Sequence, residues 1–274
     1  MNSMQLRTAV VALLGAAALG AQAQGSVSLY GVLDLSVGSF QAPGGVANRD
    51  VESGKMTTSF IGFKGVEDLG DGLSASFAIE SYMRSDTGDA GRFPGDAFWA
   101  RSAYVGLSGS MGSLNLGRNP TSLFANTVIF NAFGASFGFS PSIRHYFTSG
   151  TVTGDTGWND SVKFASLRFG GASFTAHAAL GEGTGGRNAG FSGLYLGGPV
   201  ALGFAWQKVE KGSTVADTTT WQVGGSYDAK AVKLVFGNHS EVPLPEPAFE
   251  VLVKVLKQLA KGKNVSVVPV DAEI

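Results

Sequence analysis

The short sequence patterns that could support catalysis or cofactor binding all lie in unsuitable surroundings. Residues 181–186 (GEGTGG) fit the G-x-G-x-x-G pattern, but no helical pattern follows them, and dinucleotide binding needs a helix there. Residues 134–138 (GASFG) fit the nucleophile-elbow pattern, although they lie in a long connection rather than at a strand-to-helix turn. The three histidines, His145, His177 and His239, lack the spacing of metal ligands. We therefore expect no enzyme, no cofactor and no metal site.

Composition narrows the class of protein further. The chain has 274 residues, of which 40 are glycine, 11% are aromatic and only 15% are charged, as suits a glycine- and aromatic-rich barrel. Its net charge of −1 lacks the basic excess of a nucleic-acid-binding protein. There is no cysteine, which excludes a disulfide framework and a thiolate metal site.

The chain is organised around residues 57–85, which predict a β-hairpin. Two runs of alternating residues, 57–66 and 73–85, flank an Asp- and Gly-rich turn at residues 67–72 (EDLGDG). Each run has one apolar face and one largely polar face, so neither strand is buried on both sides. A short acidic turn between long alternating strands is typical of the periplasmic end of a membrane β-barrel.

The start of the chain predicts a secretory signal peptide over residues 1–23. Arg7 provides the positive end, residues 9–19 form the apolar core, and Ala21 and Ala23 make an A-x-A cleavage site. We expect cleavage after Ala23. The apolar core is too short to span a bilayer, which takes about 20 residues.

Alternation continues to about residue 240 and predicts an all-β chain. The fold class is the antiparallel meander of a transmembrane β-barrel, incomplete, with about 10–12 strands. The connections at 41–56 and 86–96 are polar and are expected to be outward-facing loops. The predicted strands are 26–40, 57–66, 73–85, 97–108, 112–118, 159–169, 172–181, 190–197, 199–209, 218–228 and 231–239.

Five motifs, in this order along the chain, resemble the general porins of Gram-negative bacteria, in particular the β-proteobacterial type. They are residues 29–34 (LYGVLD), 59–70 (SFIGFKGVEDLG), 101–107 (RSAYVGL), 114–118 (LNLGR) and 159–164 (NDSVKF). The resemblance implies a homotrimer embedded in outer-membrane lipid, with a water-filled barrel for passive diffusion of ions and small hydrophilic solutes. It implies no nucleic-acid partner.

The longest connection, residues 119–157, is rich in aromatic residues, including Phe124, Phe130 and Tyr146. In the porins the corresponding third loop folds into the barrel and narrows the channel. We favour that position here, because exposed apolar patches of this size are unusual. The alternatives are a hydrophobic extracellular loop and a loop packed on a neighbouring molecule.

The resemblance also implies which residues line the pore, because porins select solutes with basic wall residues that face acids on the third loop. Lys64, Glu80 and Arg101 have the pore-facing parity of their strands. Arg118 lies at the root of the loop, but strict parity turns it outward, so its inclusion requires a bend at the strand end. Arg144 is the only charged residue between positions 119 and 154.

Two departures from the porin pattern affect this site. Phe60 stands where a wall arginine is usual, and Gly157 stands near a position that is often basic. Between residues 119 and 154 the long loop also has no acidic residue, so a pore of this chain should favour anions. The alternative is that each charge is merely a solvated residue of the lumen.

The pattern changes after residue 240. A proline-rich break at 241–247 is followed by a predicted helix at 248–261 and a short strand at 264–270. This tail resembles the N-terminal segment of small bacterial antitoxins of the excisionase type. The domains expected are therefore a signal peptide (1–23), an incomplete porin-like region (24–240) and an unrelated tail (241–274).

An incomplete barrel raises the question of whether the chain conducts. A water-filled porin needs about 16 strands. Unpaired edge strands cost several kcal/mol per backbone group in lipid. We therefore expect a truncated porin that does not conduct as written. The alternative is a non-functional porin remnant fused to an antitoxin fragment, which would act, if at all, as an interaction module.

Overall fold

The computed structural model describes residues 26–41, 44–148, 155–181, 186–210, 217–230 and 233–240. The predicted signal peptide and the predicted tail at 241–274 both lie outside these residues. No helix in the described part of the chain is both long enough and apolar enough to span a membrane.

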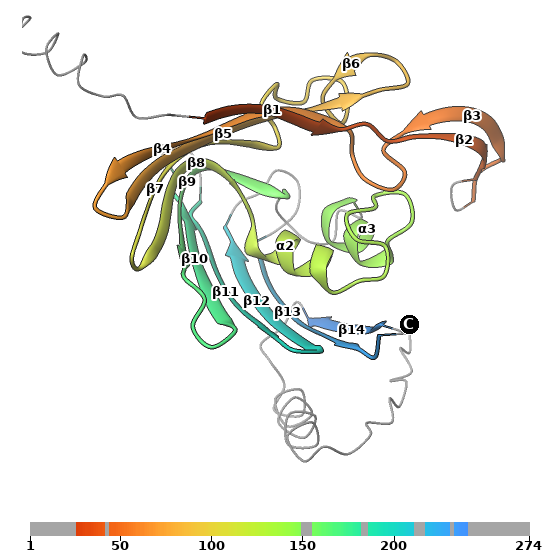
Figure 1. The fold of residues 1–274 in the computed structure, drawn as a ribbon. Coiled ribbons are helices and arrows are strands. Elements are labelled where there is room, and N and C mark those ends of the chain that lie inside the picture. Colours follow the sequence, from red (N-terminus) through yellow and green to blue (C-terminus); the bar gives the residue numbers. More distant parts are fainter. Residues whose placement is uncertain are drawn as a thin grey trace, which may run out of the picture.

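Twelve of the fourteen described strands form one sheet, in which neighbouring strands pair antiparallel along an eleven-strand path. Figure 1 shows this sheet curving around a concave inner face, with β1 and β14 as its two edges. The all-β meander is confirmed. The strands of the path are β1 (Ser26–Val32), β4 (Phe60–Gly70), β5 (Leu73–Arg84), β7 (Ser102–Gly109), β8 (Gly112–Pro120), β9 (Gly157–Ser166), β10 (Ala172–Ala179), β11 (Asn188–Gly197), β12 (Val200–Val209), β13 (Thr218–Asp228) and β14 (Lys233–Ser240).

The hairpin of β4 and β5 has a tighter turn than the sequence predicts. Asp71 and Gly72 form the turn with positive φ angles of 52° and 76°, the backbone that a two-residue hairpin requires. Residues 67–70, predicted as turn, instead extend β4, with a register shift between Asp68 and Gly70. Sequence alternation could not show this extension because acidic and glycine residues resemble a turn.

The predicted strand at 26–40 is wrong in one respect, because it is two strands separated at Leu33 and Asp34. The Asp34 carboxylate accepts hydrogen bonds from the backbone N–H groups of Met56, at 2.7 Å, and Thr57, at 2.5 Å. This contact ends β1 and lets β2 (Leu35–Phe40) pair with β3 (Asn48–Ser53) as a separate ribbon. The ribbon takes up much of the expected loop at 41–56.

A second expected loop, at 86–96, also contains a strand. β6 (Asp89–Ala90) pairs with the end of β5. Figure 1 shows this short strand beyond the rim of the sheet.

The two faces of the sheet differ in composition, and this alternation explains why the strands form. Large apolar side chains such as Leu29, Phe63 and Val105 are exposed on the outward face. The intervening residues, such as Gly62 and Glu80, are buried on the inner face. Strands such as β4 and β5 therefore bury residues of the inner face and present an apolar face outward, as in a membrane barrel, whereas the edge strand β1 has no buried residue.

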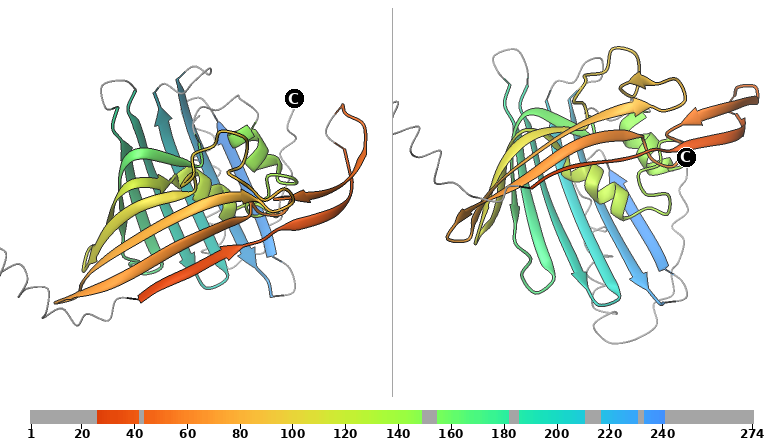
Figure 2. Two further views of the ribbon diagram at one scale, coloured as in Figure 1. Left: turned by 90° about the horizontal axis from the view of Figure 1, so that it is seen from above. Right: turned by 45° about the horizontal axis from the view of Figure 1, so that its top comes forward.

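The long loop folds against the inner face, as the sequence predicts. It contains α2 (Ser122–Ile129) and α3 (Pro141–Thr148), and Figures 1 and 2 show both on the concave side of the sheet. Thr121 caps α2, since its side chain accepts a hydrogen bond from Phe124 N at 3.2 Å.

Helix α2 rests on β11, β12 and β13. Its Leu123 packs with Ala205, and Asn126 Nδ2 donates to Gln222 Oε1 at 2.6 Å. The ring of Phe130 lies over Gly203 and Gly224, where an added Cβ would come within 2.4 Å of the ring or closer. Glycine is needed at these two positions so that the Phe130 ring of the loop can pack against the sheet.

Candidate pore-lining site

Three of the predicted residues, Lys64, Glu80 and Arg101, gather on the inner face of β4, β5 and the segment before β7. The carboxylate of Glu80 forms an ion pair with Arg101 Nη1 and accepts a hydrogen bond from the Tyr30 hydroxyl at 2.6 Å. The Arg101 guanidinium lies over the Phe60 ring, 3.9 Å from its centroid. We call these five residues the wall group.

The parity predicted for Arg101 is wrong, because Ser102 pairs with Glu80 on the inner face and Arg101 shares the parity of the outward-facing Val105. Arg101 reaches Glu80 from the irregular segment that precedes β7.

The charged side chains of the wall group differ in how far they are neutralised and how exposed they are to solvent. Glu80 is only 5% exposed and neutralises Arg101. Lys64 is exposed, and its ammonium lies 4.7 Å from the centroid of the Tyr30 ring. Within the described residues Lys64 has no acidic partner closer than 4.0 Å. Lys64 is therefore the cation of this group that is presented to solvent.

Arg118 belongs to a second group, formed with Arg92, Asp96 and Asp155. Arg92 donates to Asp96 Oδ2 at 2.8 Å and to Asp155 Oδ1 at 2.6 Å, and Arg118 donates to Asp155 Oδ2 at 2.6 Å. Two arginines and two aspartates balance in charge. Because these contacts fasten the end of the long loop to β8 and to the loop before β7, we call the four residues the loop clamp.

The direction of Arg118 differs from strict strand parity. β8 shifts register between Gly117 and Asn119, and Gly117 has a φ of +126°. This irregularity turns Arg118 so that it also donates to Ala100 O at 2.6 Å and Asn159 Oδ1 at 2.7 Å. Its side chain is only 13% exposed, so its donors are used within the protein.

Both acids of the loop clamp have a pKa below the ordinary carboxyl value. Burial alone would raise the pKa of Asp155, but the hydrogen bonds and charge of Arg92, together with those of Arg118, lower it below its ordinary value. Burial likewise opposes ionisation of Asp96, and hydrogen bonds from Arg92 lower the pKa of that carboxyl. The loop clamp is thus a charged network at neutral pH.

Arg144 is not brought to either group. It lies exposed on α3 and lines a small surface hollow with Phe139 and His145. Among the described residues it forms no ion pair with Glu80 or Asp155.

Sequence reasoning missed four residues that complete the two groups. These are Tyr30, Arg92, Asp96 and Asp155. Tyr30 has the same inward parity as Lys64 and could have been found by the register of β1 and β4. The other three lie in connections, where no periodic pattern indicates direction.

The serine of the nucleophile-elbow pattern has a structural role. Ser136 is fully buried, its hydroxyl donates to Lys55 O at 2.6 Å, and it accepts from Phe139 N at 2.8 Å. The glycine-rich residues 182–185 lie outside the described residues.

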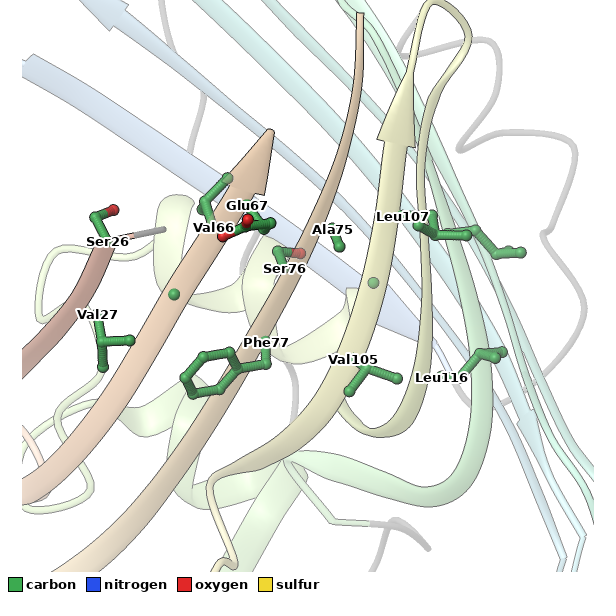
Figure 3. Close-up of a pocket in the computed structure, with 13 residues that line it drawn as sticks. Ser26, Val27, Val66, Glu67, Ala75, Ser76, Phe77, Val105, Leu107 and Leu116 are labelled. Atoms are coloured by element: carbon green, nitrogen blue, oxygen red, sulfur yellow. The ribbon is translucent and has the colours of Figure 1, made fainter. Parts of the chain in front are cut away.

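A hollow of roughly 450 Å³ lies on the outward face of the sheet and is not part of this site. Val27, Gly65, Phe77, Val105 and Leu116 form one register row there, and Figure 3 shows the side chains around it. The Phe77 ring lies over Gly65, where an added Cβ would come within 2.5 Å of it. The apolar lining of the hollow offers no group that could select an ion.

Comparison with known proteins identifies the family. The Gram-negative porin family matches residues 8–240. The outer membrane porin protein 32 of Delftia acidovorans is 30% identical, over 84% of this chain and 68% of its own length. An outer membrane porin protein of Bordetella pertussis is also 30% identical, over 81% of this chain and 66% of its own. The structure of the anion-selective porin from Comamonas acidovorans matches with a TM-score of 0.68 and 25% identity, over 79% of this chain and 68% of that chain. With its meander sheet, inward loop and charged inner face, the chain belongs to the Gram-negative porin family.

Proposed function

We propose that this chain forms the wall of a water-filled outer-membrane channel for passive diffusion of ions and small hydrophilic solutes, with a preference for anions. As a Gram-negative porin it is a protein of the outer membrane. The proposal is of a channel and includes no catalytic step and no cofactor.

The observation that carries the anion preference is the imbalance of charge on the inner face. Glu80 is occupied by Arg101 and Tyr30, and Asp155 by Arg92 and Arg118. Lys64 remains as an exposed cation that has no acidic partner in the part of the chain that the structure describes. A fixed positive charge in a narrow aqueous path raises the local concentration of anions. The solved porin from Comamonas acidovorans, which is described as anion-selective, supports this proposal by similarity.

The partners follow from the family rather than from the described contacts. We propose a homotrimer whose outward apolar face contacts outer-membrane lipid, and no nucleic-acid partner. Cross-linking of the detergent-refolded chain tests the trimer: a three-chain product supports it, and a purely monomeric product contradicts it.

The function is tested by single-channel recording on the full chain refolded into a planar bilayer. The proposed channel predicts reproducible conductance steps and a reversal potential, in a potassium chloride gradient, that shows anion preference, whereas the non-conducting chain expected from the strand count would give no steps. Lys64→Gln should abolish most of that preference, whereas Arg144→Gln is the matched control and should change it little. Cation preference in the unmodified chain would contradict the proposal.

A second candidate rests on the open sheet. In the part of the chain that the structure describes, β1 and β14 do not pair with each other. An unpaired edge in lipid costs several kcal/mol per backbone group. The second candidate is therefore a non-conducting porin remnant, which has part of the barrel wall but no closed barrel around a water-filled channel. A complete lack of conductance from refolded, bilayer-inserted chain would favour it over the channel.

A further inference from the structure

A set of buried polar side chains crosses the inner face of the sheet near the long loop. In each of Asn119, Trp158, His177, Gln207 and Thr220, at least one buried polar atom has no hydrogen-bond partner among the described residues. None of these residues is more than 4% exposed. We call them the buried polar row. Buried polar atoms in folded proteins almost always have a partner, so each needs an explanation.

The row runs from β8 to β13 and is interrupted at β11, where Gly190 stands. Asn119 pairs in register with Trp158, whose ring stacks on His177 with centroids 4.6 Å apart. Gly190 pairs with both His177 and Gln207 and has no side chain, so it separates these two polar groups by a gap. The Trp158 ring edge reaches this gap, lying 3.3 Å from where a Cβ of Gly190 would be.

The last two residues of the row lie beside the place where the long loop packs on β12 and β13. Gln207 pairs in register with Thr220, and both side chains face inward. Two residues along, Ala205 pairs with Gln222, where α2 packs directly through Leu123 and Asn126. The loop therefore contacts the sheet directly at Ala205 and Gln222. Next to this contact lie polar groups that have no partner among the described residues.

The donor and acceptor properties of the unpartnered atoms define which ligand could form hydrogen bonds with all of them. Trp158 Nε1 can only donate, Asn119 Oδ1 can only accept, and the Thr220 hydroxyl can do both. The two nitrogens of a neutral His177 are one donor and one acceptor. An anion accepts only and a metal ion needs acceptors only, so neither satisfies the whole row. The near-complete burial excludes a large polar ligand.

Water both donates and accepts and fits between buried side chains. We propose that the buried polar row binds water and forms a hydrated seam between the wall and the long loop. Ser122, the first residue of α2, also has a buried hydroxyl without a hydrogen-bond partner among the described residues. The loop is then held partly by dry packing and partly by exchangeable water-mediated hydrogen bonds.

Radiolytic hydroxyl-radical labelling of the detergent-refolded full chain tests the seam directly, because radicals form from bound water at buried positions. Rates are normalised to those of the urea-unfolded chain. We expect Trp158 and His177 to be labelled several-fold more than Leu123, which is as fully buried but packs against Ala205 and Tyr146. Normalised labelling of both residues at or below that of Leu123 would overturn the proposal.

A matched pair of variants gives an independent readout. Thr220→Val removes a hydroxyl of the seam at nearly constant shape, and Thr219→Val does the same on the opposite face of β13. If water satisfies Thr220, its removal breaks hydrogen bonds and lowers the midpoint of thermal unfolding by a few degrees more than the control. A higher midpoint for Thr220→Val shows a dry, unsatisfied hydroxyl and contradicts the seam. If this variant does not refold, the labelling experiment still tests whether the row binds water, because it uses the unmodified chain.

Discussion

The wall group and the loop clamp each pair arginine with a carboxylate, and they differ in what their arginines do. Arg101 has one acidic partner and an aromatic ring, and it leaves the neighbouring Lys64 free. Arg118 directs its donors to one carboxylate, one side-chain amide and two backbone carbonyls. The first group presents charge to the lumen side, whereas the second uses charge to hold a loop in place.

This difference predicts that an arginine on the inner face is not by itself a selectivity residue. What decides its role is how many of its donors have partners and how exposed it is. The Arg101 side chain is 32% exposed and that of Arg118 is 13% exposed. Four substitutions or conditions test whether the two groups are separable.

The largest effect is expected from Gly117→Ala, which removes the backbone irregularity that orients Arg118. Gly117 has a positive φ, and an added Cβ would lie 2.3 Å from the carbonyl oxygen of Ala103. Strain and the backbone clash together should lower the free energy of unfolding by about 3 kcal/mol or more. Urea unfolding followed by tryptophan fluorescence measures the change.

Gly193→Ala is the control for this experiment, because nothing lies within 4 Å of a Cβ at that position. The two variants should differ by most of the predicted effect. Equal stability of the two would show that β8 relaxes and that its irregularity does not hold the loop clamp.

A somewhat smaller effect is expected from Arg118→Met, which keeps the length of the side chain and removes its hydrogen bonds. Breaking a fully buried ion pair costs about 3–5 kcal/mol, and Asp155 is partly exposed, so we expect a loss of about 2–3 kcal/mol. Arg101→Met should destabilise less and should alter ion selectivity instead. A larger loss of stability from Arg101→Met would reverse the roles assigned to the two groups.

Acid should weaken the loop clamp in a defined window. The lowered pKa values of Asp96 and Asp155 mean that their stabilising contribution is fully present above the ordinary carboxyl pKa of about 4. That contribution is lost as the pH falls below about 4 and through the lowered values. Thermal unfolding between pH 7 and pH 3 should therefore show a smaller acid-induced loss in Asp155→Asn than in the unmodified chain. Arg144→Met should keep the unmodified profile, and an unchanged profile in Asp155→Asn would contradict the prediction.

The smallest effect is expected from Glu80→Gln, which removes the negative charge of the wall group and releases Arg101. Anion preference, measured as the reversal potential in a salt gradient, should increase modestly because Lys64 already presents a free charge. Tyr30→Phe is the matched control, since it removes a hydrogen bond to Glu80 without changing charge. A decrease in anion preference would mean that Glu80 organises the wall group rather than neutralising it.

Much of the fold could be predicted from local alternation. The strand predicted at 218–228 matches β13, and those at 73–85 and 199–209 match β5 and β12 to within one residue. A side-chain period of two also placed Lys64 and Glu80 on the same face, because direction in a regular strand follows from position alone. The aromatic content of the long loop correctly indicated that it folds inward. The role of these residues in a pore remains a prediction.

Tertiary structure decided where regular alternation fails and which charges meet. The turn of Arg118 depends on the backbone of Gly117, and the break at Asp34 depends on N–H groups more than 20 residues away. Arg92 and Asp155 form an ion pair although they are 63 residues apart in the sequence. Both lie in connections, where the direction of side chains follows no regular repeat. A local pattern specifies which way a strand residue points, but only the folded chain determines which partner it finds there, and therefore whether its charge remains free.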